Sequence, residues 1–454
     1  MAERSKIFGT DGVRGTANVH PMTAEMALSL GRAAAHVFQG RGGGRHRIII
    51  GKDTRLSGYL FEDALTAGIC SMGVDVLVVG PMPTPAMAFL TADMRCDAGV
   101  MISASHNPYQ DNGIKFFSSD GFKLPDEVEA RIERLIDSPD FDALRAGADE
   151  IGQARRIEDA EGRYVVFLKH TFPADRTLDG LKVVLDCANG AAYKVGPAVL
   201  SELGAELTVL AAEPNGRNIN EGCGAMHPEY AAAHVTRVGA DLGICLDGDA
   251  DRCILIAEDG VPVDGDAVLA ICGEDLHTRD ALRGGGVVGT VMSNLGLERY
   301  FEGLGLDLVR APVGDRYVVE AMRAKGYNLG GEQSGHVLFL DHNRSGDGMI
   351  TALQVMAIML RTGKKLSELA DRITRFPQVI VNVKVAEKRP LEELPDFQEA
   401  LRAAEADLGA QGRVLVRYSG TEAKARVMVE GEREEHVNQL AQELAEGLQK
   451  SLAR

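Results

Sequence analysis

The sequence predicts an α/β protein with three related α/β domains, which contain mixed, mostly parallel sheets, and a smaller C-terminal α+β domain. Two observations lead to this prediction. Short apolar runs rich in β-branched residues alternate with helical stretches over most of the chain, a pattern typical of parallel sheets covered by helices. In addition, a helix that ends on glycine just before a strand occurs three times, at 73–76, 204–207 and 305–308.

The length of the chain requires several domains. At 454 residues it exceeds a single hydrophobic core, since domains usually contain roughly 100 to 200 residues. We predict four domains, at 1–155, 156–255, 256–372 and 373–454.

Hydrophobic periodicity gives the elements of the first domain. A helix from about Thr23 is followed in order by a strand, a helix and two strands, at 47–51, 62–72, 74–79 and 97–102. A long polar helical stretch from Pro125 to about Ala146 is predicted to link this domain to the next.

The alternation of strand and helix returns in the second and third domains and changes in the fourth. The predicted strands of the middle domains are 181–185, 206–210, 242–246, 287–291 and 306–309, with helices at 193–203 and 295–303. In the last segment, strands at 379–385, 414–416 and 425–429 are combined with helices at 391–408 and 433–452. This segment is therefore predicted as a smaller α+β domain.

The charge and the cysteine content exclude several classes of protein. A formal net charge of −17 repels nucleic acid and anionic membranes, so we expect neither partner. The N-terminus has no apolar targeting segment and no apolar span is long enough to cross a bilayer, which predicts a cytoplasmic location. The seven cysteines contain no Cys-x-x-Cys pair and indicate small core residues in a reducing compartment.

The loop 103–108, Ser-Ala-Ser-His-Asn-Pro, follows an apolar strand and presents a candidate nucleophile. This candidate is the hydroxyl of Ser105, which needs a base, a charged partner or a metal because serine is a weak nucleophile. His106 alone does not complete a catalytic triad. The competing interpretation is a turn before Pro108 that only closes the strand.

The loop 247–252, Asp-Gly-Asp-Ala-Asp-Arg, places carboxylates at three alternate positions after a strand. Asp247, Asp249 and Asp251 would raise one another's pKa unless a cation neutralises them, and hard oxygen ligands without Cys or His suit Mg²⁺. An EF-hand is excluded, because Arg252 stands where that loop needs glycine and both flanks are predicted strands. The alternative is a solvated acidic turn.

The glycine-rich loop 330–336 is a candidate sugar site. Its glycines allow the backbone to approach a ligand closely, while Glu332 and Ser334 offer an acceptor and a donor for sugar hydroxyls. An ordinary glycine-rich hairpin is an equally good interpretation of this loop alone.

The segment 417–426 has the composition of a phosphate-binding loop. Hydroxyls and backbone N–H groups can bind an anion, and two arginines can add charge-assisted hydrogen bonds. The candidate residues are Arg417, Ser419, Gly420, Thr421 and Arg426. The alternative is a hairpin with solvated cations.

In this order and over nearly the whole chain, these motifs resemble the α-D-phosphohexomutase family. The resemblance is carried by the segments 8–15, 103–108, 247–252, 331–336 and 417–426. It implies that the four domains surround one central cleft and that Ser105 is a phosphoserine. The ligands of one Mg²⁺ per subunit would be Ser105, Asp247, Asp249 and Asp251. The loop with Glu332 and Ser334 would grip the sugar, and the segment 417–426 would hold the phosphate that is not transferred.

The motifs at 8–15 and 331–336 resemble the branch of the family that acts on glucosamine phosphates. The implied enzyme is an intramolecular phosphotransferase of the isomerase class, which interconverts glucosamine 6-phosphate and glucosamine 1-phosphate, a precursor of bacterial cell-wall amino sugars. Glucosamine 1,6-bisphosphate would be the intermediate or activator. The implied partner is thus a phosphorylated hexosamine, and the resemblance leaves room for a homodimer.

Phosphoryl transfer also needs a general acid and base, which contribute about 10² to 10⁴-fold in rate. The unranked candidates are Arg14, His106 and Lys115. Arg14 could instead pair structurally with an acidic neighbour, and Lys115 could be a surface cation. The alternative functions are a phosphomannomutase or phosphoglucomutase of the same family, a Mg²⁺-dependent sugar phosphatase and a non-catalytic sugar-phosphate sensor.

Overall fold

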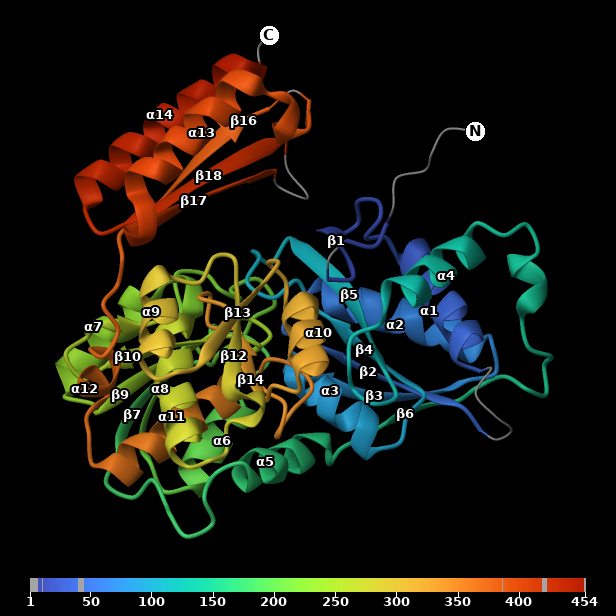
Figure 1. Cartoon of the computed structure of the whole chain (residues 1–454). Helices are drawn as coiled ribbons and strands as arrows, with labels where there is room; N and C mark the ends of the chain where they lie inside the picture. The colour runs from blue at the N-terminus through green and yellow to red at the C-terminus, as the bar shows by residue number, and fades with distance from the viewer. Residues whose placement is uncertain (1–6, 10, 40–44, 386, 419–422, 453–454) are drawn as a thin grey trace.

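The computed structural model describes residues 7–9, 11–39, 45–385, 387–418 and 423–452. It confirms three α/β domains with mixed sheets and a C-terminal α+β domain (Figure 1). In chain order the sheets that the described residues form have six, five, four and three strands. Among the described residues, no helix combines the length and the apolar character that crossing a membrane requires.

The first sheet has the strand order β1-β5-β4-β2-β3-β6. Strands β2, β3, β4 and β6 are parallel, while β5 runs antiparallel to both β4 and β1. The strands are β1 (Val13–Thr16), β2 (Arg47–Lys52), β3 (Asp75–Pro81), β4 (Ala98–Ile102), β5 (Asp111–Ser118) and β6 (Ala154–Arg156). The helices are α1 (Ala24–Phe38), α2 (Ser57–Cys70), α3 (Thr84–Asp93) and α4 (Asp126–Ile136).

The second sheet has the order β11-β10-β9-β7-β8. Its strands are β7 (Lys182–Asp186), β8 (Glu206–Leu210), β9 (Leu242–Leu246), β10 (Cys253–Ala257) and β11 (Pro262–Val263). Its helices are α6 (Val195–Glu202) and α7 (Pro228–Val238), and α5 (Ala160–His170) precedes them.

The third sheet has the order β13-β12-β14-β15. Its strands are β12 (Gly286–Thr290), β13 (Asp307–Ala311), β14 (Leu329–Gly331) and β15 (Val337–Phe339). The helices around it are α8 (Gly265–Thr278), α9 (Leu295–Gly303), α10 (Asp315–Lys325), α11 (Gly348–Thr362) and α12 (Leu366–Ala370).

The fourth domain is an antiparallel sheet with two long helices, α13 (Pro395–Leu408) and α14 (Glu434–Leu452). Its strand order is β16-β18-β17, formed by β16 (Gln378–Lys384), β17 (Gly412–Tyr418) and β18 (Lys424–Gly431). The predicted helix at 391–408 begins late, because Pro395 occupies the start of α13 and only a 3₁₀ turn precedes it.

One hydrophobic core runs through the first three domains. Met87 of α3, Tyr164 of α5, Leu246 of β9 and Met356 of α11 belong to the same buried cluster. The fourth domain has a core of its own, and it joins the third domain through polar contacts such as that of Arg413 Nη1 with Val291 O (2.9 Å). The shared core therefore fixes the loops of the first three domains relative to one another.

The prediction that the stretch 125–146 links the first two domains is wrong. Helix α4 ends at Ile136, and its Ile132 is buried in the core of the first domain. The linking helix is α5, at the bottom of Figure 1, whose Tyr164 lies in the shared core. One buried face was enough to keep the otherwise polar α4 in the first domain.

Candidate active site

Ser105 lies in the turn between β4 and β5, with its backbone in the left-handed region at φ +52°. Two buried side chains hold this turn by its carbonyl. Arg55 Nη2 donates to Ser105 O at 3.1 Å, and Asn220 Nδ2 donates to the same oxygen at 3.0 Å. Arg55 comes from the first domain and Asn220 from the second. The backbone of the turn is therefore held by contacts that do not involve the serine side chain.

The three aspartates follow the fully buried strand β9 and meet the serine. Asp247 Oδ2 accepts a hydrogen bond of 2.6 Å from Ser105 Oγ, across 142 positions of sequence. One oxygen each of Asp247, Asp249 and Asp251 lies within 4.8 Å of the others. Gly248 permits this approach, because a Cβ there would lie 2.6 Å from Ser105 O. The structure thus brings all four predicted metal ligands together.

The charge of this acidic cluster fits a divalent cation. Burial, together with repulsion from Asp251 and Asp249, raises the pKa of Asp247 to about 8. Oδ1 of Asp249 and Oδ1 of Asp251 are buried and accept no hydrogen bond from any residue that the structure describes. Buried carboxylate oxygens without partners are costly unless a cation compensates them. Oxygen donors of this kind suit Mg²⁺.

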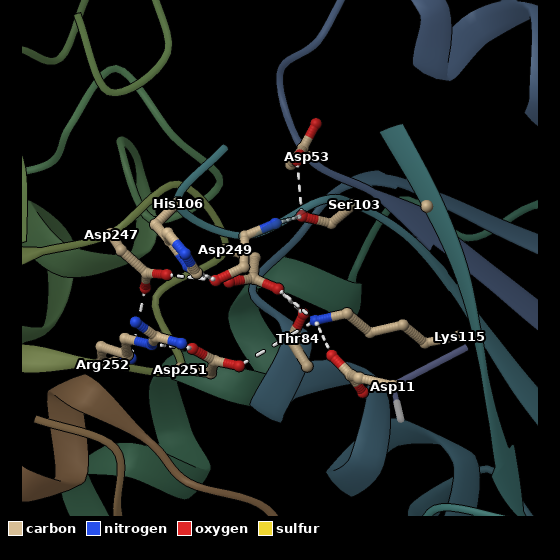
Figure 2. A network of polar contacts seen from close by, with 12 residues as sticks. Asp11, Asp53, Thr84, Ser103, His106, Lys115, Asp247, Asp249, Asp251 and Arg252 are labelled. Carbon is tan, nitrogen blue, oxygen red and sulfur yellow. Dashed lines mark hydrogen bonds and ion pairs between the residues drawn. The ribbon is translucent and has the colours of Figure 1, made fainter. Parts of the chain in front are cut away.

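Lys115 reaches the aspartates from β5, as Figure 2 shows. Its Nζ lies 2.9 Å from Asp249 Oδ2 and 3.3 Å from Asp11 Oδ2, and its side chain is only 1% exposed. Burial alone would lower the pKa of Lys115, but Asp11 and Asp249 raise it above the ordinary value. Lys115 is therefore a buried, charged group of the site, and the alternative of a surface cation is wrong.

His106 and Arg14 differ in what they can do with a proton. His106 Nδ1 lies 3.3 Å from Ser105 Oγ, and burial, together with the Arg252 and Arg14 charges, lowers the pKa of His106 to about 4. Arg14 is paired with Asp11, which keeps the pKa of Arg14 above its ordinary value although burial opposes this. At neutral pH His106 is uncharged and can accept a proton, whereas Arg14 stays charged.

Glu332 and Ser334 lie in the loop between β14 and β15. Glu332 Oε1 accepts a hydrogen bond from Gly314 N at 2.9 Å, and Ser334 Oγ donates to Glu332 Oε2 at 3.3 Å. Gly335 allows this loop to pack closely against the second domain, since a Cβ at its φ of +90° would lie 2.4 Å from Cys253 O. The candidate sugar loop therefore adjoins the domain that carries the aspartates.

Several polar neighbours of the site were not among the predicted residues. His336 Nδ1 lies 3.6 Å from Asp251 Oδ2, and Thr84 Oγ1 donates to Asp249 Oδ2 at 2.6 Å. Asp11, described above, joins Lys115 to Arg14. Asp11 and His336 lie inside segments 8–15 and 331–336, so the motifs contained a signal for them. Thr84 is the first residue of α3, and the sequence contained no such signal for it.

Arg417 and Arg426 are paired across β17 and β18. Together with Asn382 and Lys424 they line a cavity of about 310 Å³ that also touches Met292 of the third domain. Burial and the neighbouring Arg426 charge lower the pKa of Arg417. A cationic cavity of this kind suits an anion. The predicted Ser419, Gly420 and Thr421 lie outside the described residues.

This fold and this site define a sugar-phosphate mutase, and the chain matches four domain families. They are described as phosphoglucomutase/phosphomannomutase alpha/beta/alpha domain I (residues 5–143), domain II (163–260), domain III (264–376) and the C-terminal domain (380–447). The chain belongs to the phosphoglucomutase/phosphomannomutase family. It is therefore an isomerase that transfers phosphate within its substrate.

A similar protein of known name indicates which member of the family this chain resembles. A phosphoglucosamine mutase of Syntrophotalea carbinolica is 59% identical over 449 residues, which cover 99% of this chain and 98% of that protein.

Two solved structures share the fold. A phosphoglucomutase/phosphomannomutase family protein of Burkholderia thailandensis is 24% identical with a TM-score of 0.82, covering 98% of this chain and 97% of that chain. An N-acetylphosphoglucosamine mutase of Aspergillus fumigatus, in complex with GlcNAc-6P and magnesium, is 19% identical with a TM-score of 0.66, covering 98% and 96%.

Proposed function

We propose that this chain interconverts glucosamine 6-phosphate and glucosamine 1-phosphate through phosphorylated Ser105 and glucosamine 1,6-bisphosphate, and so supplies amino sugars for cell-wall precursors. The observation that carries this proposal is the hydrogen bond between Ser105 Oγ and Asp247 inside a buried acidic cluster. A hydroxyl in that position can form a phosphate ester beside a metal site. The name of the relative at 59% identity supports the amino sugar as substrate.

The proposed metal ligands are the residues that meet at the end of β9. Ser105, Asp247, Asp249 and Asp251 would hold one Mg²⁺ per chain. When bound, this ion would offset the charge of about −1.5 to −2 that a phosphoserine carries. The aspartates and the buried turn keep the serine oxygen fixed, which suits a reaction that depends mainly on positioning and electrostatics.

Two side chains would serve the proton transfers, and a third would stabilise charge. His106 lies within reach of Ser105 Oγ, and Lys115 lies beside Asp249, so both are proposed as acid–base residues. Arg14 is proposed to stabilise charge rather than to exchange a proton, because its pKa stays high.

The other predicted residues are proposed to bind substrate. Glu332 and Ser334 would grip the hexose, and the cationic cavity of the fourth domain would hold the phosphate that is not transferred. The residues proposed to bind this phosphate are Arg417 and Arg426, which line the cavity, and Ser419, Gly420 and Thr421, which the sequence alone suggests. Because the bisphosphate must turn over between the two transfers, this cavity has to accept either phosphate. The domain boundaries, the cytoplasmic location and a homodimer stay predictions from sequence.

A comparison of turnover for glucosamine, glucose and mannose 6-phosphate tests the proposed substrate preference. We expect kcat/KM for glucosamine 6-phosphate to exceed the values for glucose and mannose 6-phosphate by about 10-fold or more, since a charged ammonium at C2 makes stronger hydrogen bonds than the neutral hydroxyl of the other two sugars. The assay is formation of the 1-phosphate with a trace of bisphosphate. Preference for glucose or mannose would reassign the enzyme within its family, and release of free phosphate would favour the phosphatase.

Replacing Arg417 with methionine tests the phosphate cavity. We expect KM to rise by about 10-fold with a smaller change in kcat, because a ground-state contact to phosphate is lost. The matched control is Arg402→Met, which removes the same charge from an exposed position on α13. An unchanged KM for Arg417→Met would remove this residue from the substrate site.

A further inference from the structure

Lys123 lies where the first domain meets the third. It follows β5, and its side chain is 13% exposed. Its Nζ contacts Asp11 of the first domain and lies 2.6 Å from Asp315 Oδ2 of the third. Asp315 begins α10, the helix that Figure 1 shows on the side of the third domain nearest the first. Lys123 thus joins two carboxylates from different domains.

Asp11 connects Lys123 to the proposed acid–base lysine. Its Oδ2 lies 3.3 Å from Lys115 Nζ, and the same carboxylate also pairs with Arg14. Burial would raise the pKa of Asp11, but Lys115, Lys123 and Arg14 hold it well below the ordinary value. Asp11 is therefore an ionised group whose position depends on the cations around it.

Asp315 connects Lys123 to the proposed sugar grip. Its neighbour Gly314 donates from N to Glu332 Oε1 at 2.9 Å, and His336 Nε2 lies 3.6 Å from Asp315 Oδ2. A displacement of Asp315 would therefore move the partners of both Glu332 and His336.

Asp251 closes these contacts into a ring, because it lies 3.6 Å from His336 Nδ1 and 4.0 Å from Lys115 Nζ. The ring alternates basic and acidic side chains and crosses three domains. Its members, in order, are Lys115, Asp11, Lys123, Asp315, His336 and Asp251.

We propose that Lys123 is a positioning residue for the phosphoryl transfer, which fixes Lys115 relative to the sugar grip at Glu332 by bridging Asp11 and Asp315. This inference rests on the proposed function, since Lys115 and Glu332 must act on the same hexose. An error of about 1 Å in the relative position of reacting groups costs up to about 10²-fold in rate. Lys123 needs no contact with substrate to have this effect.

Lys123→Met tests the proposal, because methionine keeps most of the length and removes the charge. Asp11 retains Arg14 and Lys115, and Asp315 retains His336, so the fold should persist. We expect kcat to fall by about 10 to 100-fold with little change in KM. Lys123→Arg should recover most of the loss, since it restores a cation between the two carboxylates.

Arg316→Met is the matched control. Arg316 joins the same two domains, through Leu124 O (2.7 Å) and Glu129 (3.0 Å), which lie outside the ring. If Lys123 acts by positioning, Arg316→Met keeps kcat within about threefold of wild type although it loosens the same interface. Melting temperatures of both variants measure that loosening.

A double-mutant cycle supplies the deciding measurement. Because Lys123 and Asp315 act as one bridge, Lys123→Met with Asp315→Asn should be no slower than the slower single variant. The positioning role would be overturned if the losses of kcat in the two single variants multiply in the double variant. It would also be overturned if kcat is unchanged in Lys123→Met, or if Arg316→Met lowers kcat as much as Lys123→Met does. A wild-type chain without mutase activity would instead overturn the proposed function, so the two failures are distinguishable.

Discussion

Ser105→Ala is expected to abolish isomerisation, lowering turnover by about 10⁴-fold or more, as removal of a nucleophile does in other enzymes. The hydroxyl is the group that lies 2.6 Å from Asp247 and 3.3 Å from His106. Alanine keeps the backbone of the turn, because Arg55 and Asn220 hold the Ser105 carbonyl and not its side chain. The loss should therefore be chemical, with the fold preserved.

The measurement combines turnover of glucosamine 6-phosphate with ³¹P spectroscopy of the protein. The wild type should show a phosphoserine signal after incubation with bisphosphate, and Ser105→Ala should not. Ser71→Ala is the control, since it removes a hydroxyl that caps α2 in the same domain, where Ser71 Oγ donates to Gly68 O. Normal turnover in Ser105→Ala would end the phosphoserine assignment. Loss of the folded state in both variants would instead contradict the claim that the loss is purely chemical.

The centre of the site was predictable because each part of it is a short, contiguous signal at the end of an apolar strand. Ser105 and Asp247 follow β4 and β9, and the ends of strands are where a sheet presents polar groups. What sequence alone could not supply was the pairing between distant segments. Asp11 lies in a motif and Asp315 begins a helix 304 positions later, and nothing in the sequence indicates that Lys123 pairs with both.

The secondary structure was likewise predictable only where a local pattern of apolar residues indicated it. Most of the strands and helices that were predicted lie near their observed positions, since a buried face leaves a period in the sequence. Helices α3, α8 and α11 were not predicted, because most of their residues are buried on all sides and leave little amphipathic pattern. The linker was misplaced for the opposite reason, as polar α4 has only a narrow buried face.

Asp249→Asn is expected to weaken Mg²⁺ binding and to slow phosphoryl transfer, each by about 10²-fold or more. Oδ2 of Asp249 already accepts from Thr84 Oγ1 and Lys115 Nζ, whereas within the described part of the chain nothing donates to its buried Oδ1. An amide must place its NH₂ either against these two donors or on the open side. The first orientation removes the hydrogen bonds from Thr84 and Lys115, and the second removes the oxygen that would bind the metal.

The binding defect can be measured apart from activity by thermal unfolding with and without Mg²⁺. A ligand at 100 times its Kd stabilises the folded state by about 2.7 kcal/mol, so wild type should melt at a higher temperature with the ion and Asp249→Asn should respond little. Asp241→Asn makes the same change in charge at the other end of β9, where Asp241 accepts from Lys182 N at 2.8 Å, and it should respond like wild type. If Asp249→Asn binds Mg²⁺ normally but is inactive, Asp249 acts through Lys115 and Thr84 rather than as a ligand. If both variants lose the response, the stabilisation depends on the overall charge and not on this loop.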